Sequence, residues 1–180
     1  LFVFLFLLGL FFSFSSTSSI VAEKVNKQIY FFFIKHLVFV SISLFLLIII
    51  SIQDKNKLIK FLPYLFFISI LLLSLIPVFG VEVKGSKRWL DLIFLPIFQP
   101  VELVKPLFII FVAKIIVLNK KINIYNRYLY SFLVLLLIVI FLINQPDLGQ
   151  TLLLILTWFT MIFVSGFNMI VLSILGLAIL

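Results

Sequence analysis

Cysteine is absent from the 180-residue sequence, so the chain can form no disulfide, no thiolate metal site and no thiol nucleophile. Charged residues are also scarce, at 11% of the chain compared with roughly 25% in a soluble domain. The chain therefore has too little polar surface to cover a water-facing globule, which excludes a soluble fold. The one histidine, His36, stands beside Lys35 at the edge of an apolar run, and we interpret it as an interfacial anchor.

Apolar residues dominate instead: they form 65% of the chain, and phenylalanine alone occurs 24 times. Such a composition is typical of helices packed within a lipid bilayer, so membrane lipids are the expected surroundings. The formal net charge of +8 does not indicate a nucleic-acid partner, because Lys and Arg in the loops of a membrane protein commonly set its orientation.

Long apolar runs follow one another along the whole chain. A helix that crosses a bilayer needs about 20 mostly apolar residues. Six runs reach or approach that length, and a seventh starts near Asn168 and continues to Leu180. We therefore predict an all-α, polytopic transmembrane helix bundle that forms one domain over residues 1–180. The six complete runs are Leu1–Phe14, Lys35–Ile52, Phe61–Phe79, Pro100–Leu118, Tyr128–Ile143 and Leu148–Gly166.

The ends of the sequence do not resemble natural termini. The chain opens on Leu1, with no Met and no basic leader, and its last residues lie inside an apolar run. We expect the parent protein to continue in both directions.

The loops between the runs form two alternating sets. One set, Gln53–Lys60 and Asn119–Arg127, is short and rich in Lys and Arg. The other set, Ser15–Ile34, Gly80–Gln99 and Asn144–Asp147, contains four of the six acids. The numbers of basic residues on the two sides are similar and do not decide the orientation. We assign the first set to the inside of the membrane, because compact basic loops beside the membrane are typical of the cytoplasmic side, and the other set to the outside.

The region around Pro100 carries charges where a span should begin. Pro is tolerated at the first helical position, so Gln99-Pro100 indicates a helix start. Glu102 and Lys105 then share a face and can pair, and their cost in lipid suggests that this face looks into a cavity. Pro106 leaves the Glu102 carbonyl without its helical donor, which predicts a kink. Alternatively, Glu102 offsets the helix dipole and Lys105 extends to the interface.

A basic cluster precedes this region. Lys84, Lys87 and Arg88 suit an anionic diphosphate, and Arg offers a planar fork to phosphate oxygens. Gly85 would allow the backbone to approach a ligand closely. The alternative is a solvated basic loop in which Trp89 anchors the aromatic belt, which is the better interpretation of Trp89 itself. For Arg88 we favour substrate binding or an ion pair inside a cavity.

Three polar motifs occur in a fixed order: KGSKRW at 84–89, QPVELVK at 99–105 and QPDLGQT at 145–151. They resemble the K-G-[AS]-x-R-W, Q-P-S-E-x-x-K and Q-P-D-x-G-T motifs of the FtsW/RodA/SpoVE (SEDS) family, and the resemblance covers essentially the whole chain. GVEVKGSKRWLDL is closer to the division branch of the family than to the elongation branch. Val101 replaces the Ser of the second motif, and Gln150 precedes Thr151 in the third.

The resemblance implies a peptidoglycan glycosyltransferase that polymerises lipid II, an undecaprenyl diphosphate-linked disaccharide peptide, during cell division. The parent would have ten spans in the bacterial inner (cytoplasmic) membrane, with a class B penicillin-binding protein and other division proteins as partners. The family's catalytic Asp belongs to a large outer loop after the seventh span, beyond Leu180, so this chain alone is predicted to be inactive. A lipid II flippase, an elongation polymerase and a structural scaffold remain alternatives.

The site residues follow from the same resemblance. No metal ligand set is predicted, although a divalent cation would be a suitable aid to the departing diphosphate. Asp147 follows Pro146 at a helix start, so we interpret it as architectural or supporting rather than as the general base. The predicted substrate cavity comprises Lys84, Lys87, Arg88, Gln99, Glu102 and Lys105, supported by Trp89, Gln145 and Asp147.

The loop assignment can be tested by cysteine labelling, since the chain has no cysteine of its own. Single cysteines near Lys84 and Asp147 should react with an impermeant maleimide from outside the cell, and cysteines near Lys57 and Lys120 only from inside. The opposite labelling pattern would reverse the predicted topology.

Overall fold

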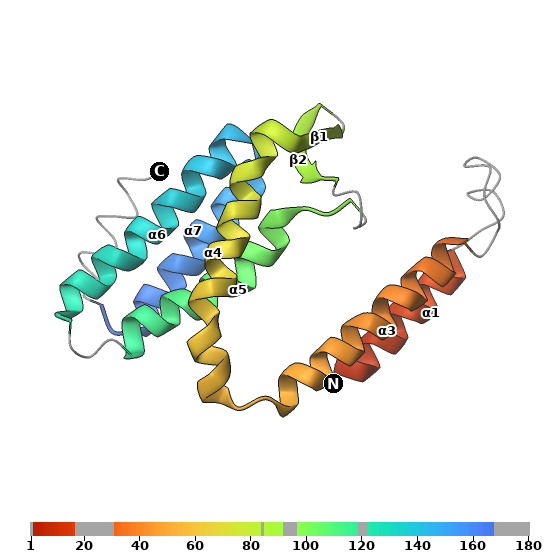
Figure 1. Ribbon diagram of the computed structural model, residues 1–180, viewed down its shortest axis with the longest axis horizontal. Helices are drawn as coiled ribbons and strands as arrows, with labels where there is room; N and C mark the ends of the chain where they lie inside the picture. Colours follow the sequence, from red (N-terminus) through yellow and green to blue (C-terminus); the bar gives the residue numbers. More distant parts are fainter. Residues whose placement is uncertain (1, 17–30, 84, 92–96, 119–121, 168–180) are drawn as a thin grey trace. The chain divides into compact units, whose positions relative to one another are not determined.

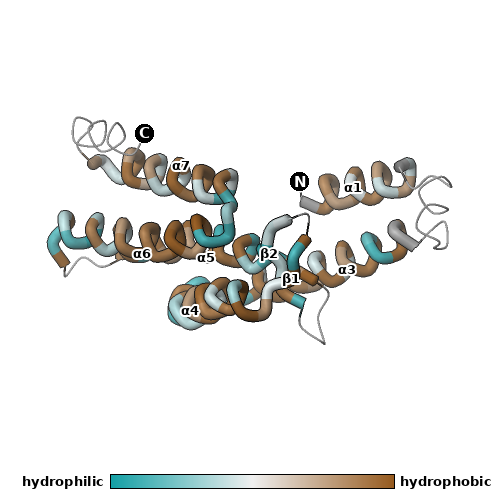
Figure 2. Tube along the Cα trace, turned by 90° about the horizontal axis from the view of Figure 1, so that it is seen from above, coloured by the Kyte–Doolittle hydropathy of each residue, from teal (hydrophilic) through white to brown (hydrophobic). Residues whose placement is uncertain are grey.

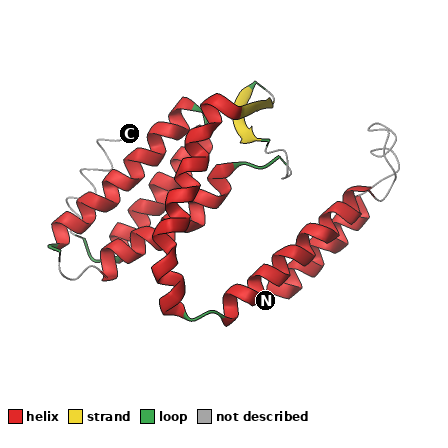
Figure 3. Ribbon diagram, viewed as in Figure 1, coloured by secondary structure: helices red, strands yellow, loops and turns green. Residues whose placement is uncertain are grey.

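The computed structural model describes residues 2–16, 31–83, 85–91, 97–118 and 122–167 (Figure 1). These residues divide into two units, Leu1–Lys55 and Asn56–Leu180. The described part of the chain is almost entirely helical, with one short β-hairpin (Figure 3). An all-α fold was predicted and is confirmed, while the predicted seventh run from Asn168 lies outside the described residues.

The first unit is a pair of helices, α1 (Phe2–Ser16) and α3 (Phe31–Ile52), which lie side by side. The rings of Phe14 and Phe33 meet edge to face, with centroids 5.2 Å apart. Val40 is the only described residue of this unit that is buried. Exposed apolar area costs about 25 cal/mol per Å² in water, so a pair of helices with apolar side chains on every face requires lipid as its solvent.

The second unit contains α4 (Lys55–Phe79), α5 (Pro100–Leu118), α6 (Ile124–Asn144) and α7 (Leu148–Val164). The strands β1 (Gly80–Val83) and β2 (Ser86–Leu90) follow α4. Figure 1 shows the hairpin, the start of α5 and the α6–α7 turn at the same end of this unit. We call this end, formed by residues 80–91, 97–105 and 144–151, the polar end. Figure 2 shows hydrophilic residues gathered at the α6–α7 turn.

Each helix of the second unit buries one narrow stripe of side chains. In α5 the buried positions include Val104, Phe108 and Val112, and in α7 they include Leu154 and Trp158. The spacing of three or four residues is that of one helical face. The stripe is not visible in the sequence, because the lipid-facing positions are equally apolar.

The bounds of the helices differ from the predicted runs at several ends. α5 has the predicted bounds, whereas α4 begins at Lys55 and α6 at Ile124, so part of each predicted basic loop is helical. Lys is a good helix former and is tolerated in an exposed helical turn outside the apolar layer. α7 ends at Val164, before the predicted Gly166.

Gly166 ends α7 through its backbone conformation. It has φ +85°, which L side chains rarely adopt. Its N–H donates to the Phe163 carbonyl, and the N–H of Phe167 donates to the Ile162 carbonyl. These two bonds form a Schellman motif, which satisfies carbonyls that the last helical turn would leave free.

Three described helices are long and apolar enough to cross a bilayer: Phe33–Ile52, Lys55–Phe79 and Ile124–Asn144. Two shorter apolar helices are Val3–Ser15 and Leu148–Val164. The predicted span α5 is not one of these three helices, because it contains three charged residues, Glu102, Lys105 and Lys114. The polytopic architecture is confirmed, and the described residues account for part of the predicted seven spans.

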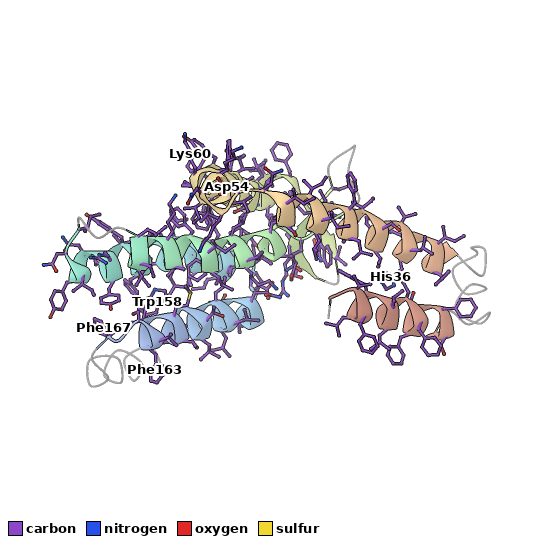
Figure 4. The ribbon with its side chains drawn as sticks, turned by 90° about the horizontal axis from the view of Figure 1, so that it is seen from below. His36, Asp54, Lys60, Trp158, Phe163 and Phe167 are labelled. Carbon is purple, nitrogen blue, oxygen red and sulfur yellow. The ribbon has the colours of Figure 1, made fainter. Side chains whose placement is uncertain are left out.

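Hydroxyl groups join α6 to α7 within the apolar interior. Trp158 Nε1 donates to Ser131 Oγ over 3.1 Å, and Figure 4 shows Trp158 between the two helices. Ser165 Oγ and Tyr128 Oη make a second link of 3.2 Å. Figure 4 also shows Phe163 on the outer side of α7. Short polar links of this kind hold membrane helices together where apolar contact with lipid is no worse than contact with a helix.

A lysine supplies a hydrogen bond that a proline removes. Pro63 lies inside α4 and has no N–H, so the carbonyl of Ile59, four residues earlier, loses its helical donor. Lys114 of α5 replaces that donor, with its Nζ 2.7 Å from the Ile59 oxygen. The Phe66 and Phe111 rings stack beside this contact, 4.4 Å between centroids.

The contact predicts non-additive mutational effects. Lys114→Met should lower the free energy of unfolding of the full-length protein by about 1–3 kcal/mol, because it leaves a carbonyl without a donor. Pro63→Ala restores the helical N–H, so the double variant should regain most of that loss. A double-mutant cycle in detergent unfolding measures the coupling. Lys87→Met is the control, and strictly additive effects would contradict this account.

Candidate functional site

The hairpin at the polar end places Arg88 and Gln99 near each other. β1 and β2 pair antiparallel, with Val83 opposite Ser86. Gly85 lies in the turn with φ +80°, so its observed role is to permit a tight turn. Leu90 and Phe98 then exchange two backbone hydrogen bonds of 2.9 and 3.1 Å, which hold the chain before α5 against β2.

Arg88 joins the hairpin to the α6–α7 turn. Its Nε donates to the Gln145 carbonyl over 3.2 Å, and its Nη2 donates to the Pro146 carbonyl over 2.6 Å. Its Nη1 lies 3.4 Å from Asp147 Oδ1. The guanidinium therefore satisfies two carbonyls at the end of α6 and neutralises a buried carboxylate, which is the planar, many-donor contact that Arg makes and Lys cannot.

Asp147 is the centre of the contact network and is only 5% exposed. Its Oδ2 accepts a bond of 3.1 Å from Gln99 Nε2, and its Oδ1 accepts one of 3.5 Å from the Gln150 N–H. The second contact caps the N-terminus of α7, where a negative charge also offsets the helix dipole. The observed contacts agree with the architectural interpretation of Asp147.

These contacts surround an open cavity of about 650 Å³. All three motif-bearing segments contribute residues to its wall, although Arg88 and Pro146 are 58 residues apart in the sequence. The lining residues are Val83, Gly85, Ser86, Arg88, Trp89, Gln99, Pro146, Asp147 and Gln150.

The predicted basic cluster does not assemble as one group. A β-bulge makes Arg88 the extra residue of β2, because Val81 pairs with Trp89 and Glu82 with Lys87. Of the two basic residues of this strand, only Arg88 lines the cavity. Lys87 is exposed, and Lys84 lies outside the described residues. Trp89 is half-buried and contributes to the cavity wall, and its role as an aromatic-belt anchor stays a prediction.

The predicted pair of Glu102 and Lys105 is confirmed, with 2.7 Å between Glu102 Oε2 and Lys105 Nζ. The Glu102 side chain is 55% exposed and the Lys105 side chain 20%. Neither belongs to the lining of the cavity described above. The pair therefore stands on the first two turns of α5, beside the network rather than within it.

Two buried amide atoms of the α6–α7 segment have no hydrogen-bond partner among the described residues: Gln145 Nε2 and Gln150 Oε1. Gln145 was predicted as a supporting residue, and Gln150 was noted only as a departure from the motif. The position of Gln150, three residues after Asp147 on the first turn of a helix, is the sequence feature that indicates contact with Asp147.

The described residues contain no group of three or more His, Cys, Asp or Glu side chains that could hold a metal ion. The predicted divalent cation thus has no ligand set among them, and its involvement stays a prediction.

Several apolar helices of membrane-spanning length define a multi-pass membrane protein. A partly buried ion pair and its hydrogen bonds connect the segments at one end of the second unit. All of residues 1–180 match the family model for FtsW/RodA/SpoVE cell cycle proteins. The chain belongs to this family.

Relatives of the chain include proteins named as probable peptidoglycan glycosyltransferase FtsW. The Aliivibrio salmonicida protein is 31% identical over 154 residues, covering 84% of this chain and 38% of its own length. The Haemophilus influenzae protein is 32% identical over 173 residues, covering 92% of this chain and 42% of its own length. The chain therefore spans about two fifths of the length of these relatives.

Solved structures share the fold. A chain of a peptidoglycan synthase complex matches with a TM-score of 0.70 and 25% identity, covering 96% of this chain and 52% of that one. The rod-shape-determining protein RodA of Thermus thermophilus matches with a TM-score of 0.68 and 24% identity, covering 94% of this chain and 57% of that one.

Replacement of Asp147 should loosen the polar end. Asp147→Ala leaves Arg88 without its counter-charge and α7 without its cap, so the full-length protein should lose about 1–3 kcal/mol of unfolding free energy. Detergent unfolding gives this value, and Asp91→Ala, at an exposed acid of the polar end, is the matched control. Equal stability of both variants would show that the network contributes nothing.

Proposed function

We propose that the parent protein is a peptidoglycan glycosyltransferase that polymerises lipid II in the bacterial inner membrane during cell division. The names of the relatives support the activity, and the cell cycle family supports the division role. The observation that carries the proposal is the convergence of the three motif-bearing segments on Asp147, through Arg88 and Gln99.

The chemistry requires a base beside the attacking sugar hydroxyl and stabilisation of the departing diphosphate. Asp147 is buried and fully engaged, and Glu102 is paired with Lys105. Glu82 and Asp91 are exposed on the hairpin and after it. None of these four acids has the free, positioned carboxylate of a general base, which supports a base supplied from the family's outer loop beyond Leu180.

The predicted partner is a class B penicillin-binding protein that cross-links the glycan. The solved complex with a similar chain is described as coordinating polymerization and crosslinking. A partner of this kind is therefore proposed for the parent protein as well, together with lipid II as the substrate.

Purified full-length protein with fluorescent lipid II tests the activity directly. A polymerase should yield a ladder of glycan strands, whereas a lipid II flippase should yield none. Residues 1–180 alone should also be inactive, because the proposed base lies outside them. Polymer from this piece alone, free of other polymerases, would show that the base has been misplaced.

The same assay tests the charged pair of α5. Glu102→Ala and Lys105→Ala should each lower polymerisation by at least about 10²-fold, a typical loss when one preorganised charge is removed. Each should insert into the membrane normally and fail to complement a depletion strain. Glu82→Ala is the control, an exposed acid of the same end. Normal growth of either single variant would remove the pair from the proposed site.

A further inference from the structure

The cavity at the polar end carries no net charge among the described residues that line it. Its only charged members are Arg88 and Asp147, and their side chains are paired at 3.4 Å. A diphosphate that entered would meet the Asp147 carboxylate together with the Arg88 cation. The attraction and the repulsion would largely cancel, so the described lining residues offer no net electrostatic gain to an anion.

Three of the five N–H groups of Arg88 are already engaged. All three of its nitrogens are engaged: Nε and Nη2 donate to backbone carbonyls, and Nη1 contacts Asp147. Bidentate binding of a phosphate uses two adjacent N–H groups of the guanidinium fork. Binding through the Nε–Nη2 edge would release carbonyls at the end of α6, so only one N–H of Nη1 and one of Nη2 remain for a phosphate.

The unpartnered atom in the cavity wall is an acceptor. Gln150 Oε1 is buried and has no donor within the described part of the chain. A diphosphate presents acceptor oxygens and cannot satisfy it. A sugar hydroxyl or an acetamido N–H is a donor, and a hydroxyl can accept in return from a neighbouring amide such as that of Gln99.

The remaining wall suits a saccharide in shape and surface. Trp89 contributes an aromatic surface, and aromatic side chains combine a large apolar area with a polar edge. The volume of about 650 Å³ lies within the range of roughly 300–1,000 Å³ typical of small-molecule sites.

We propose that this cavity binds the neutral sugar portion of the substrate, and that the diphosphate binds elsewhere. The inference rests on the proposed function for the identity of that substrate. Gln150 is then a specificity-determining residue that accepts a hydrogen bond from the sugar, while Arg88 and Asp147 hold the cavity walls in position.

Saturation-transfer NMR on the full-length protein in nanodiscs tests the proposal without requiring turnover. The probe is N,N′-diacetylchitobiose, a neutral disaccharide with two acetamido groups. Its acetamido methyl protons should receive saturation from the protein, and excess inorganic pyrophosphate should leave that signal unchanged. Displacement of the sugar by pyrophosphate, or the absence of any sugar signal, would overturn the proposal.

Gln150→Met removes the acceptor and keeps the approximate length and volume of the side chain. It should weaken disaccharide binding by roughly tenfold, the order expected for one lost hydrogen bond. Gln53→Met, at an exposed glutamine after α3, is the matched control and should bind normally. Unchanged binding by a folded Gln150→Met variant would remove Gln150 from the site. If the variant does not fold, the competition between sugar and pyrophosphate in the wild type still tests the proposal.

The outcome is separable from that of the proposed function. Sugar binding without glycan ladders would retain the cavity assignment and reject the polymerase. Glycan ladders without sugar binding, or with sugar displaced by pyrophosphate, would retain the polymerase and reject the cavity assignment.

Discussion

The ion pair between Arg88 and Asp147 is the contact on which the polar end depends. It connects a β-hairpin to a helix–helix turn almost 60 residues away, and it does so where the chain leaves the apolar layer. Both partners also bond to backbone groups at helix ends, so the pair is stabilised by hydrogen bonds as well as by charge. A partly buried pair contributes to a structure only when its remaining donors and acceptors are satisfied in this way.

Inside the bundle, polar side chains also have specific hydrogen-bond partners. Lys114 supplies the donor that Pro63 removes, and Ser131 accepts from Trp158. In lipid no water is available to bond an unsatisfied carbonyl. These contacts therefore favour particular faces of neighbouring helices. Apolar packing alone would not distinguish the faces, since lipid tails are as apolar as the side chains.

Engagement of the charged groups has a consequence for chemistry. Arg88, for which the sequence left both substrate binding and an ion pair open, is paired with Asp147, and Glu102 is paired with Lys105. The described residues that line the cavity are polar and carry no net charge, and among them the buried Gln150 Oε1 is an acceptor without a donor. Such a wall favours ligands that donate hydrogen bonds and disfavours anions, which separates the recognition of a sugar from the handling of a leaving diphosphate.

The sequence by itself determined that this protein is surrounded by lipid, in which order its helices follow, and that α5 starts at Pro100. Composition and the length of apolar runs carry that information, because a bilayer admits few other solutions. It also placed Glu102 and Lys105 on one face, since their spacing is local. The tertiary structure alone decided that Arg88 and Lys87 separate, that Gln150 joins the cavity wall, and which apolar stripe of each helix is buried. Those outcomes depend on contacts between distant segments, and uniformly apolar helices carry no periodic signal from which such contacts can be inferred.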